Sequence, residues 1–180
     1  EARRMATYLK SMDLPAGSPI AIISKNCAHW IISDWAIWMA GHVSVPLYPT
    51  LNADTVRHIL EHSGAQMAFV GKLDDWEMMK PGIPETLHCI SYPLSPETDF
   101  PSWDDIVAQQ SPLQPVAKPD ADDLATVVYT SGSTGKPKGV MLSFANMAHA
   151  AEGGVQALDI TPEERMLSYL PLAHVFERFV

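Results

Sequence analysis

The chain has 180 residues, of which 47% are hydrophobic and 18% charged, and its formal net charge is −9. These values fit a globular protein with one well-formed core. The acidic balance argues against a nucleic-acid partner, because phosphate backbones need a basic face. Cys27 and Cys89 are too few for a disulfide framework, so we expect two buried, reduced thiols in a cytoplasmic protein without a secretory signal.

Helical and strand-like patterns alternate along the chain. Helices are predicted at residues 2–12, 28–40, 52–61, 72–80, 102–110 and 145–158, with one helical turn at 161–164. Strands are predicted at residues 20–24, 43–49, 66–70, 87–91, 125–129, 140–143 and 166–170. The alternation predicts the α/β class, with a layered, mostly parallel sheet covered by helices on both faces.

The predicted helix at 28–40 is apolar on nearly every side, and Asn26 is placed to cap its start. It is too short to span a bilayer, which takes ~20 apolar residues, and Asp34 lies near its centre. We therefore expect it to be buried between layers. Contact with a membrane surface is the alternative, although the helix offers no lysine or arginine for it.

Residues 58–62 match the His-x-x-Glu-His pattern of one class of zinc site. Helical spacing puts Val56, Ile59 and Leu60 on one face and His58 and His62 on the opposite face. A zinc pair should face a cavity and needs a third ligand. We therefore interpret these histidines as a solvated helix face and predict no metal there.

The most informative stretch is a loop rich in glycine, hydroxyl groups and lysine. Between residues 130 and 139 lie three glycines, four Ser or Thr hydroxyls and two lysines. Glycines let the backbone approach a ligand, successive N–H groups form an anion site, and hydroxyls and lysines add donors and positive charge. Strand patterns on both sides predict a loop that joins two strands and binds phosphate. It is not a Walker loop, because Thr130 stands where that pattern needs its first glycine and Pro137 follows Lys136.

This stretch resembles the phosphate-loop signature of the adenylate-forming superfamily, which includes acyl-CoA synthetases, luciferases and peptide-synthetase adenylation domains. Residues 170–178, Leu-Pro-Leu-Ala-His-Val-Phe-Glu-Arg, resemble a second motif of that superfamily in the form typical of long-chain fatty acyl-CoA synthetases. Residues 20–26 and 41–60 are also similar to that subfamily, so the resemblance covers nearly the whole chain.

The resemblance implies an enzyme that joins a fatty acid to AMP, releases pyrophosphate, and passes the acyl group to coenzyme A, with ATP and Mg²⁺ required. It implies that the β- and γ-phosphates are bound by the loop residues Thr130, Ser131, Gly132, Ser133, Thr134, Gly135, Lys136 and Lys138. It also places His174 beside the carboxylate substrate, where a ring N–H would donate to the acyl carbonyl. Glu177 and Arg178 are expected to form a surface salt bridge without a catalytic role.

Relatives in this superfamily are about three times longer, so we expect residues 1–180 to be part of an N-terminal domain that is inactive alone. Their later magnesium, ribose and catalytic-lysine motifs are not in this sequence, and Phe144 stands where many have histidine. Two alternatives stay open: a ligase for medium-chain or aryl acids, and a non-catalytic nucleotide-binding or interaction module. A P-loop kinase or ATPase is disfavoured by the failed Walker spacing.

Overall fold

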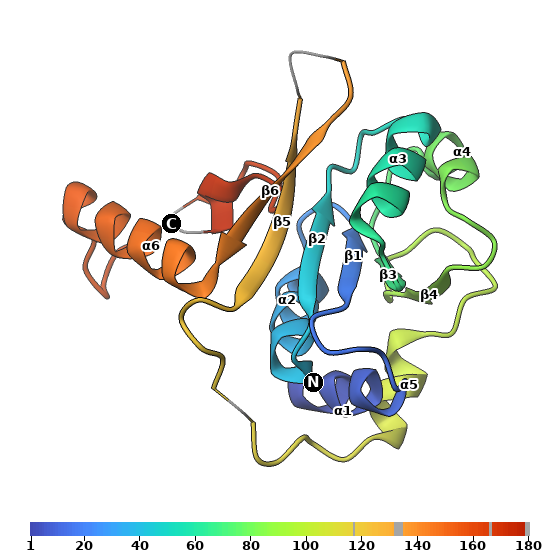
Figure 1. The fold of residues 1–180 in the computed structure, drawn as a ribbon, viewed down its shortest axis with the longest axis horizontal. Helices are drawn as coiled ribbons and strands as arrows, with labels where there is room; N and C mark the ends of the chain where they lie inside the picture. Colours follow the sequence, from blue (N-terminus) through green and yellow to red (C-terminus); the bar gives the residue numbers. More distant parts are fainter. Residues whose placement is uncertain (117, 132–134, 166, 179–180) are drawn as a thin grey trace.

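The structure, a computed structural model, describes residues 1–116, 118–131, 135–165 and 167–178. These residues form a sheet of six strands in the order β4-β3-β1-β2-β5-β6 (Figure 1). The strands are β1 (Pro19–Ile23), β2 (Val43–Leu47), β3 (Met67–Val70), β4 (His88–Ser91), β5 (Leu124–Thr130) and β6 (Lys138–Ser143). All neighbouring strands pair in parallel except β5 and β6, which form an antiparallel hairpin. The predicted mostly parallel sheet is confirmed.

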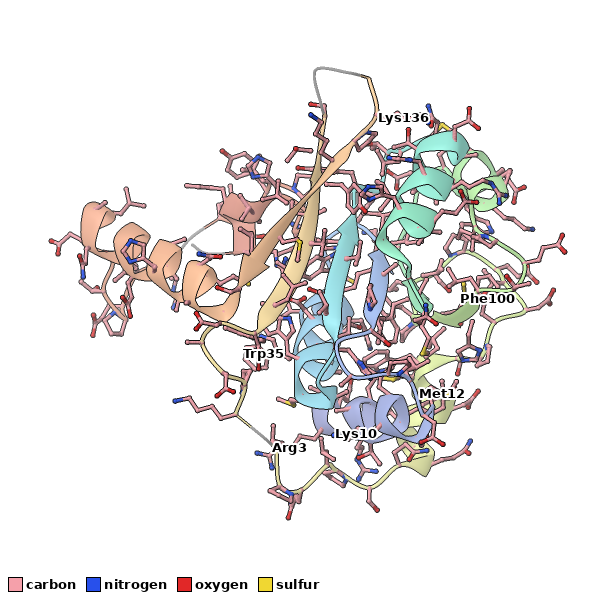
Figure 2. All side chains as sticks on the ribbon, viewed as in Figure 1. Arg3, Lys10, Met12, Trp35, Phe100 and Lys136 are labelled. Carbon is pink, nitrogen blue, oxygen red and sulfur yellow. The ribbon has the colours of Figure 1, made fainter. Side chains whose placement is uncertain are left out.

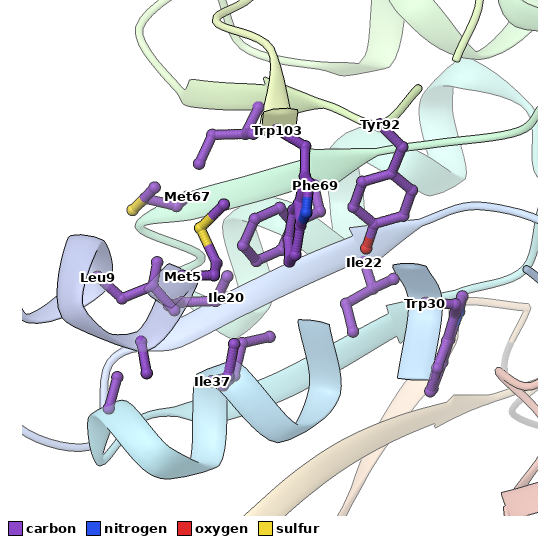
Figure 3. Packing of buried hydrophobic residues seen from close by; sticks show 14 of the residues in the cluster. Met5, Leu9, Ile20, Ile22, Trp30, Ile37, Met67, Phe69, Tyr92 and Trp103 are labelled. Atoms are coloured by element: carbon purple, nitrogen blue, oxygen red, sulfur yellow. The ribbon is translucent and has the colours of Figure 1, made fainter. Parts of the chain in front are cut away.

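Helices cover both faces of this sheet. They are α1 (Ala2–Ser11), α2 (Ala28–Ala40), α3 (Ala53–Ser63), α4 (Trp76–Met79), α5 (Trp103–Gln109) and α6 (Phe144–Leu158), with short 3-10 helices η1 (Lys80–Gly82) and η2 (Val175–Arg178). On one face, α1, α2 and α5 pack a core that includes Ile22, Phe69 and Trp103 (Figure 3). On the other face, α3 and α4 pack against alternate strand residues such as Ile23 and Val70. Strands buried on both faces are continuously apolar, as β1 and β3 are.

The predicted helix and strand limits agree with the structure to within a few residues through α6. Asn52 caps α3 by accepting a hydrogen bond from the Thr55 N–H (2.9 Å), and Gly64 ends that helix in the left-handed conformation. Both cysteine thiols are free; Cys89 is buried as expected, whereas Cys27 is half-buried. None of the described helices is long and apolar enough to cross a bilayer.

Two predictions after α6 are wrong. Residues 161–164 form a turn rather than a helical turn, and residues 167–170 form no strand. At Leu170 the backbone groups bond to side chains instead of to a neighbouring strand: its N–H donates to Glu177 Oε2 (3.2 Å), and its carbonyl accepts from Asn26 Nδ2 (2.7 Å). Asn26 is therefore not the cap of α2; Cys27 occupies that position, without a side-chain capping bond.

Candidate functional site

The phosphate-loop candidate joins the two arms of the β5–β6 hairpin. Thr130 pairs with Lys138, and Tyr129 pairs with Gly139, so the arms remain in register up to the loop. Because β5 runs parallel to β2, the loop lies at the edge of the sheet where the parallel strands have their carboxyl ends. Ligands of open α/β sheets bind at this edge. The hairpin extends beyond the other strands, and Lys136 lies near its end (Figures 1 and 2).

The loop residues that the structure describes are open to solvent. Exposed positions include Thr130, Ser131, Gly135, Lys136 and Lys138. Gly135 has a φ of +87°, the left-handed conformation that only glycine adopts readily. Gly132, Ser133 and Thr134, which were also predicted to bind phosphate, lie outside the described residues. The hydroxyl-bearing end of the loop, at residues 130–131, and the end that carries Gly135, Lys136 and Lys138 are thus both exposed.

A cavity of about 380 Å³ lies beside the base of the loop. Its lining combines the loop ends with the segment that follows β2 and with α3: Pro46, Tyr48, Leu51, Ile59, Tyr129, Thr130, Ser131 and Pro137. Most of these side chains are apolar or aromatic, and the loop adds the hydroxyls of Thr130 and Ser131. Small-molecule sites commonly combine apolar walls with a few polar groups in this way.

His58 is half-buried and His62 is exposed, as expected of a solvated helix face, but both histidines also contact the hairpin. His58 Nε2 lies 3.1 Å from the Pro137 carbonyl, which requires that nitrogen to be the donor. His62 Nδ1 lies 2.7 Å from the Tyr129 hydroxyl, and burial raises the pKa of that phenol, which therefore stays protonated at neutral pH. The described residues contain no group of three His, Cys, Asp or Glu side chains that could hold a metal ion.

Asn26, which follows β1, binds the backbone at the start of the second motif, residues 170–178. The Asn26 Nδ2 donates to the Leu170 carbonyl (2.7 Å), and its Oδ1 accepts from the Leu172 N–H (2.8 Å). A single amide side chain thus pairs with the backbone as an adjacent strand would. Leu172 is buried in the core on the α2 face, so this end of the motif is fixed to the body of the fold.

His174 lies in the turn before η2, with its side chain exposed. Its Nδ1 accepts a hydrogen bond from the Phe176 N–H (3.2 Å). A ring nitrogen that accepts carries no proton, so the neutral ring bears its proton on Nε2. That nitrogen is therefore free to donate to a carbonyl group.

Arg178 is buried, so the predicted surface salt bridge with Glu177 is wrong. Its Nη2 forms an ion pair with Asp34 Oδ2 at 2.6 Å, and the two side chains are 3% and 5% exposed. Arg178 also donates to Thr126 Oγ1 (3.0 Å) and Ser44 Oγ (3.3 Å). Its guanidinium carbon lies 5.3 Å and 5.6 Å from the ring centroids of Trp30 and Trp38. We call these five partners, Asp34, Ser44, Thr126, Trp30 and Trp38, the arginine socket.

Opposing influences act on the Asp34 carboxyl in this socket. Burial raises its pKa above the ordinary value, while the Arg178 charge and the hydrogen bond from Ser44 act in the opposite direction. An arginine guanidinium keeps its charge in folded proteins. We therefore regard the pair as ionised at neutral pH.

The sequence carried a signal for this ion pair that our prediction did not use. Asp34 lies within a helix predicted to be buried, and a buried carboxylate needs a cation or a set of donors. What the sequence could not show is that the 170–178 segment returns to α2.

The loop at residues 130–138 and the 170–178 segment are both attached to β5 but do not contact each other through described hydrogen bonds or ion pairs. Arg178 reaches Thr126 of β5, and the same strand leads into the phosphate-loop candidate after Thr130. No hydrogen bond or ion pair between described residues joins His174 to the loop residues 130–131 or 135–138. The structure thus anchors both motifs to one strand and leaves His174 and Lys136 exposed.

Comparison with known proteins identifies what this chain is similar to. A family model described as "AMP-binding enzyme" matches residues 1–180. Fatty acyl-CoA synthetase A of Dictyostelium discoideum is 34% identical over 195 residues, covering 99% of this chain and 29% of that protein. Long chain acyl-CoA synthetase 6, peroxisomal, of Arabidopsis thaliana is 34% identical over 180 residues, covering 92% of this chain and 25% of that protein.

Among solved structures, ATP-bound MatB from Rhodopseudomonas palustris matches with a TM-score of 0.79 and 25% identity, covering 99% of this chain and 35% of that one. The chain therefore spans between a quarter and about a third of the length of these relatives.

Proposed function

Because this chain belongs to the AMP-binding enzyme family, we propose that it is the ATP-phosphate-binding part of a long-chain fatty acid–CoA ligase. In this proposal residues 1–180 are the N-terminal portion of a longer enzyme, and its partners are the small molecules ATP, a fatty acid and coenzyme A. The names of the relatives support the long-chain substrate class. The ATP-bound state of the similar MatB structure supports the nucleotide. The observation that carries the proposal is the exposed glycine- and lysine-bearing loop at the carboxyl edge of the sheet.

The proposed reaction has two steps. A carboxylate oxygen of the fatty acid attacks the α-phosphorus of ATP; the bond to the bridging oxygen breaks, and pyrophosphate leaves with its electron pair. The thiolate sulfur of coenzyme A then attacks the acyl carbon, and AMP leaves. Such phosphoryl-group chemistry depends mainly on positioning and on neutralising charge that develops on the oxygens.

Residues of this chain would contribute to the first step in two ways. Lys136 and Lys138 would neutralise the β- and γ-phosphates, which become the pyrophosphate leaving group, with the loop amides and hydroxyls as donors. His174 Nε2–H would donate a hydrogen bond to the acyl carbonyl, since Nδ1 is already engaged by the Phe176 N–H. Mg²⁺ would arrive with the ATP phosphates and supply counter-charge. The proposal assigns it no ligand in this chain, because the described residues hold no suitable cluster.

Pyrophosphate release tests the proposal. The whole protein that contains this chain is given ATP, Mg²⁺ and palmitate, octanoate or benzoate in turn, with the Lys136→Ala and Lys138→Ala variants measured beside it. We expect release with palmitate, and a loss of about 100–1000-fold in kcat/KM for ATP in each variant, since removing one charge-stabilising group costs on this order. Lys10→Ala is the matched control, because Lys10 is also exposed but lies at the opposite end of the molecule (Figure 2).

Each other outcome identifies a different error. Release with benzoate alone would favour an aryl-acid ligase over a fatty-acid ligase. Binding of ATP without release for any acid would favour a nucleotide-binding module. The 180-residue chain alone is expected to release no pyrophosphate, and turnover by it would contradict the assignment to a partial domain.

A further inference from the structure

We infer that Arg178 is a positioning residue: seated in the arginine socket, it fixes the 170–178 segment on β5 and so sets where the His174 imidazole stands at the active site. Arg178 would act without touching any substrate. The inference rests on the proposed function, because it assigns a role in the same reaction.

The polar groups of the socket come from three separate elements of the fold, all of which precede Arg178 in the sequence. Asp34 comes from α2, Ser44 from β2 and Thr126 from β5, and all three are buried. The Thr126 hydroxyl accepts from Arg178 Nη1 and donates to the Ser44 carbonyl at 2.9 Å, so each of its hydrogen-bonding roles is used. Three buried polar side chains that converge on one point of an otherwise apolar face cost free energy unless a donor meets them. Arg178 is that donor.

The two terminal nitrogens of the guanidinium contact different polar groups of the socket. Nη2 faces Asp34 and Ser44, while Nη1 faces Thr126. The planar group also lies over the Trp30 and Trp38 rings. A guanidinium held by a carboxylate, two hydroxyls and two ring faces has little freedom to turn, and a lysine ammonium could not satisfy all of these partners.

His174 lies between two fixed points of the same short segment. Asn26 binds the backbone at Leu170 and Leu172, and Arg178 is anchored four residues after His174. Between them, the His174 N–H donates to the Pro171 carbonyl (2.8 Å), and the Glu177 N–H donates to the His174 carbonyl (3.2 Å). Any shift of Arg178 would therefore pass through η2 to His174, whereas no hydrogen bond or ion pair between described residues joins Arg178 to the loop residues 130–131 or 135–138.

A purely stabilising role of Arg178 and a positioning role predict different results when the ion pair is replaced by apolar residues. Buried ion pairs can often be replaced by apolar residues of similar volume without loss of stability. If Arg178 only stabilised the fold, such a replacement would restore activity together with stability. If Arg178 positions His174, the replacement would restore stability and leave the rate low.

The test measures adenylation and unfolding in the whole protein for Arg178→Met, Arg178→Lys and the pair Asp34→Leu/Arg178→Met. We expect Arg178→Met to lower kcat for pyrophosphate release by about 100-fold, the order of loss that a misplacement of about 1 Å can cause, with KM for ATP changed by less than about threefold. Arg178→Lys should lose less, because it keeps the charge beside Asp34. The paired variant should regain the wild-type unfolding midpoint but not the rate.

The double variant His174→Ala/Arg178→Met separates a positioning role from a purely structural one, because only the former makes the two losses in kcat non-additive. If Arg178 acts through His174, adding Arg178→Met to His174→Ala should cost less than about threefold, because residues that act as a unit are not additive. Lys25→Met is the matched control: it removes a surface ion pair with Asp74 of similar length (2.7 Å) that is 40% and 75% exposed, and it should leave kcat unchanged.

Two results would overturn the inference: full activity in the paired variant, or losses that multiply in the double variant. If Arg178→Met does not fold, Arg178→Lys and the paired variant provide the same comparison. Failure of the proposed function is recognised separately, because then the unaltered protein would release no pyrophosphate with any acid, and the inference would fall with it. An active wild type with unaffected Arg178 variants would remove the inference alone.

Discussion

The substitution Asp34→Asn tests the burial of the ion pair at α2 without changing the size of a side chain. Asparagine keeps the shape of aspartate and removes its charge, so Arg178 would be left as a buried cation without a counter-charge. Removing one partner of a buried pair typically costs about 3–5 kcal/mol. Both side chains are at most 5% exposed and their atoms lie 2.6 Å apart, so we expect the full cost.

The matched control is Asp74→Asn, which removes the carboxylate of the Lys25–Asp74 pair. The distance is nearly the same, 2.7 Å, but the side chains are 40% and 75% exposed. Exposed pairs contribute about 0–1 kcal/mol, because water screens the charges. Burial, rather than distance, therefore separates the two predictions.

Urea unfolding of the 180-residue chain, followed by circular dichroism, measures the difference. With a slope of about 1–3 kcal/mol per molar urea, Asp34→Asn should lower the midpoint by roughly 1 to 5 M, and Asp74→Asn by about 1 M at most. Equal, small losses in both variants would refute the reasoning. They would mean that Asp34 is already protonated in the fold, so that burial, which raises its pKa, outweighs Arg178.

Three further predictions concern the body of the fold. Burial, and to a smaller extent the charge of Lys10, lower the pKa of His42 below its ordinary value of 6.5, so the folded state resists protonation of this ring. The free energy of unfolding should therefore fall as the pH drops below 6.5. Urea titrations should show a smaller fall in His42→Gln than in the unaltered protein, with His149→Gln as the control. Burial raises the pKa of the Cys89 thiol to about 12, so iodoacetamide at pH 8 should label half-buried Cys27 in the native chain and Cys89 only in urea, as mass spectrometry would show. Asn26→Ala removes both bonds to the second motif and should cost about 1–3 kcal/mol of unfolding free energy.

The sequence predicted the sheet well because its signals are local. A continuously apolar run such as residues 19–23 can be satisfied only by a strand covered on both faces, and Asn52 and Gly64 delimit α3 by their own backbone chemistry. The β5–β6 hairpin was predictable for the same reason, since strand patterns flank a loop of glycines and lysines.

The second motif was harder to predict because its structure depends on partners far along the chain. Residues 167–170 have the composition of a strand, but a side chain 144 residues away, Asn26, supplies the bond that a strand would. The sequence alone suggests that Arg178 is exposed, because its contacts with α2 and β5 become visible only in the fold. Neither contact leaves a periodic pattern, so only the fold reveals them.

The affinities of the whole protein for ATP and for AMP, compared between the unaltered form and the Lys136→Ala/Lys138→Ala variant, measure directly whether the hairpin loop holds the β- and γ-phosphates. Because AMP lacks these phosphates, we expect the variant to bind ATP at least about tenfold more weakly, a loss of about 1.4 kcal/mol or more, and to bind AMP as before. Equal affinities for ATP in the two forms, or the same loss for both nucleotides, would contradict a phosphate-binding loop.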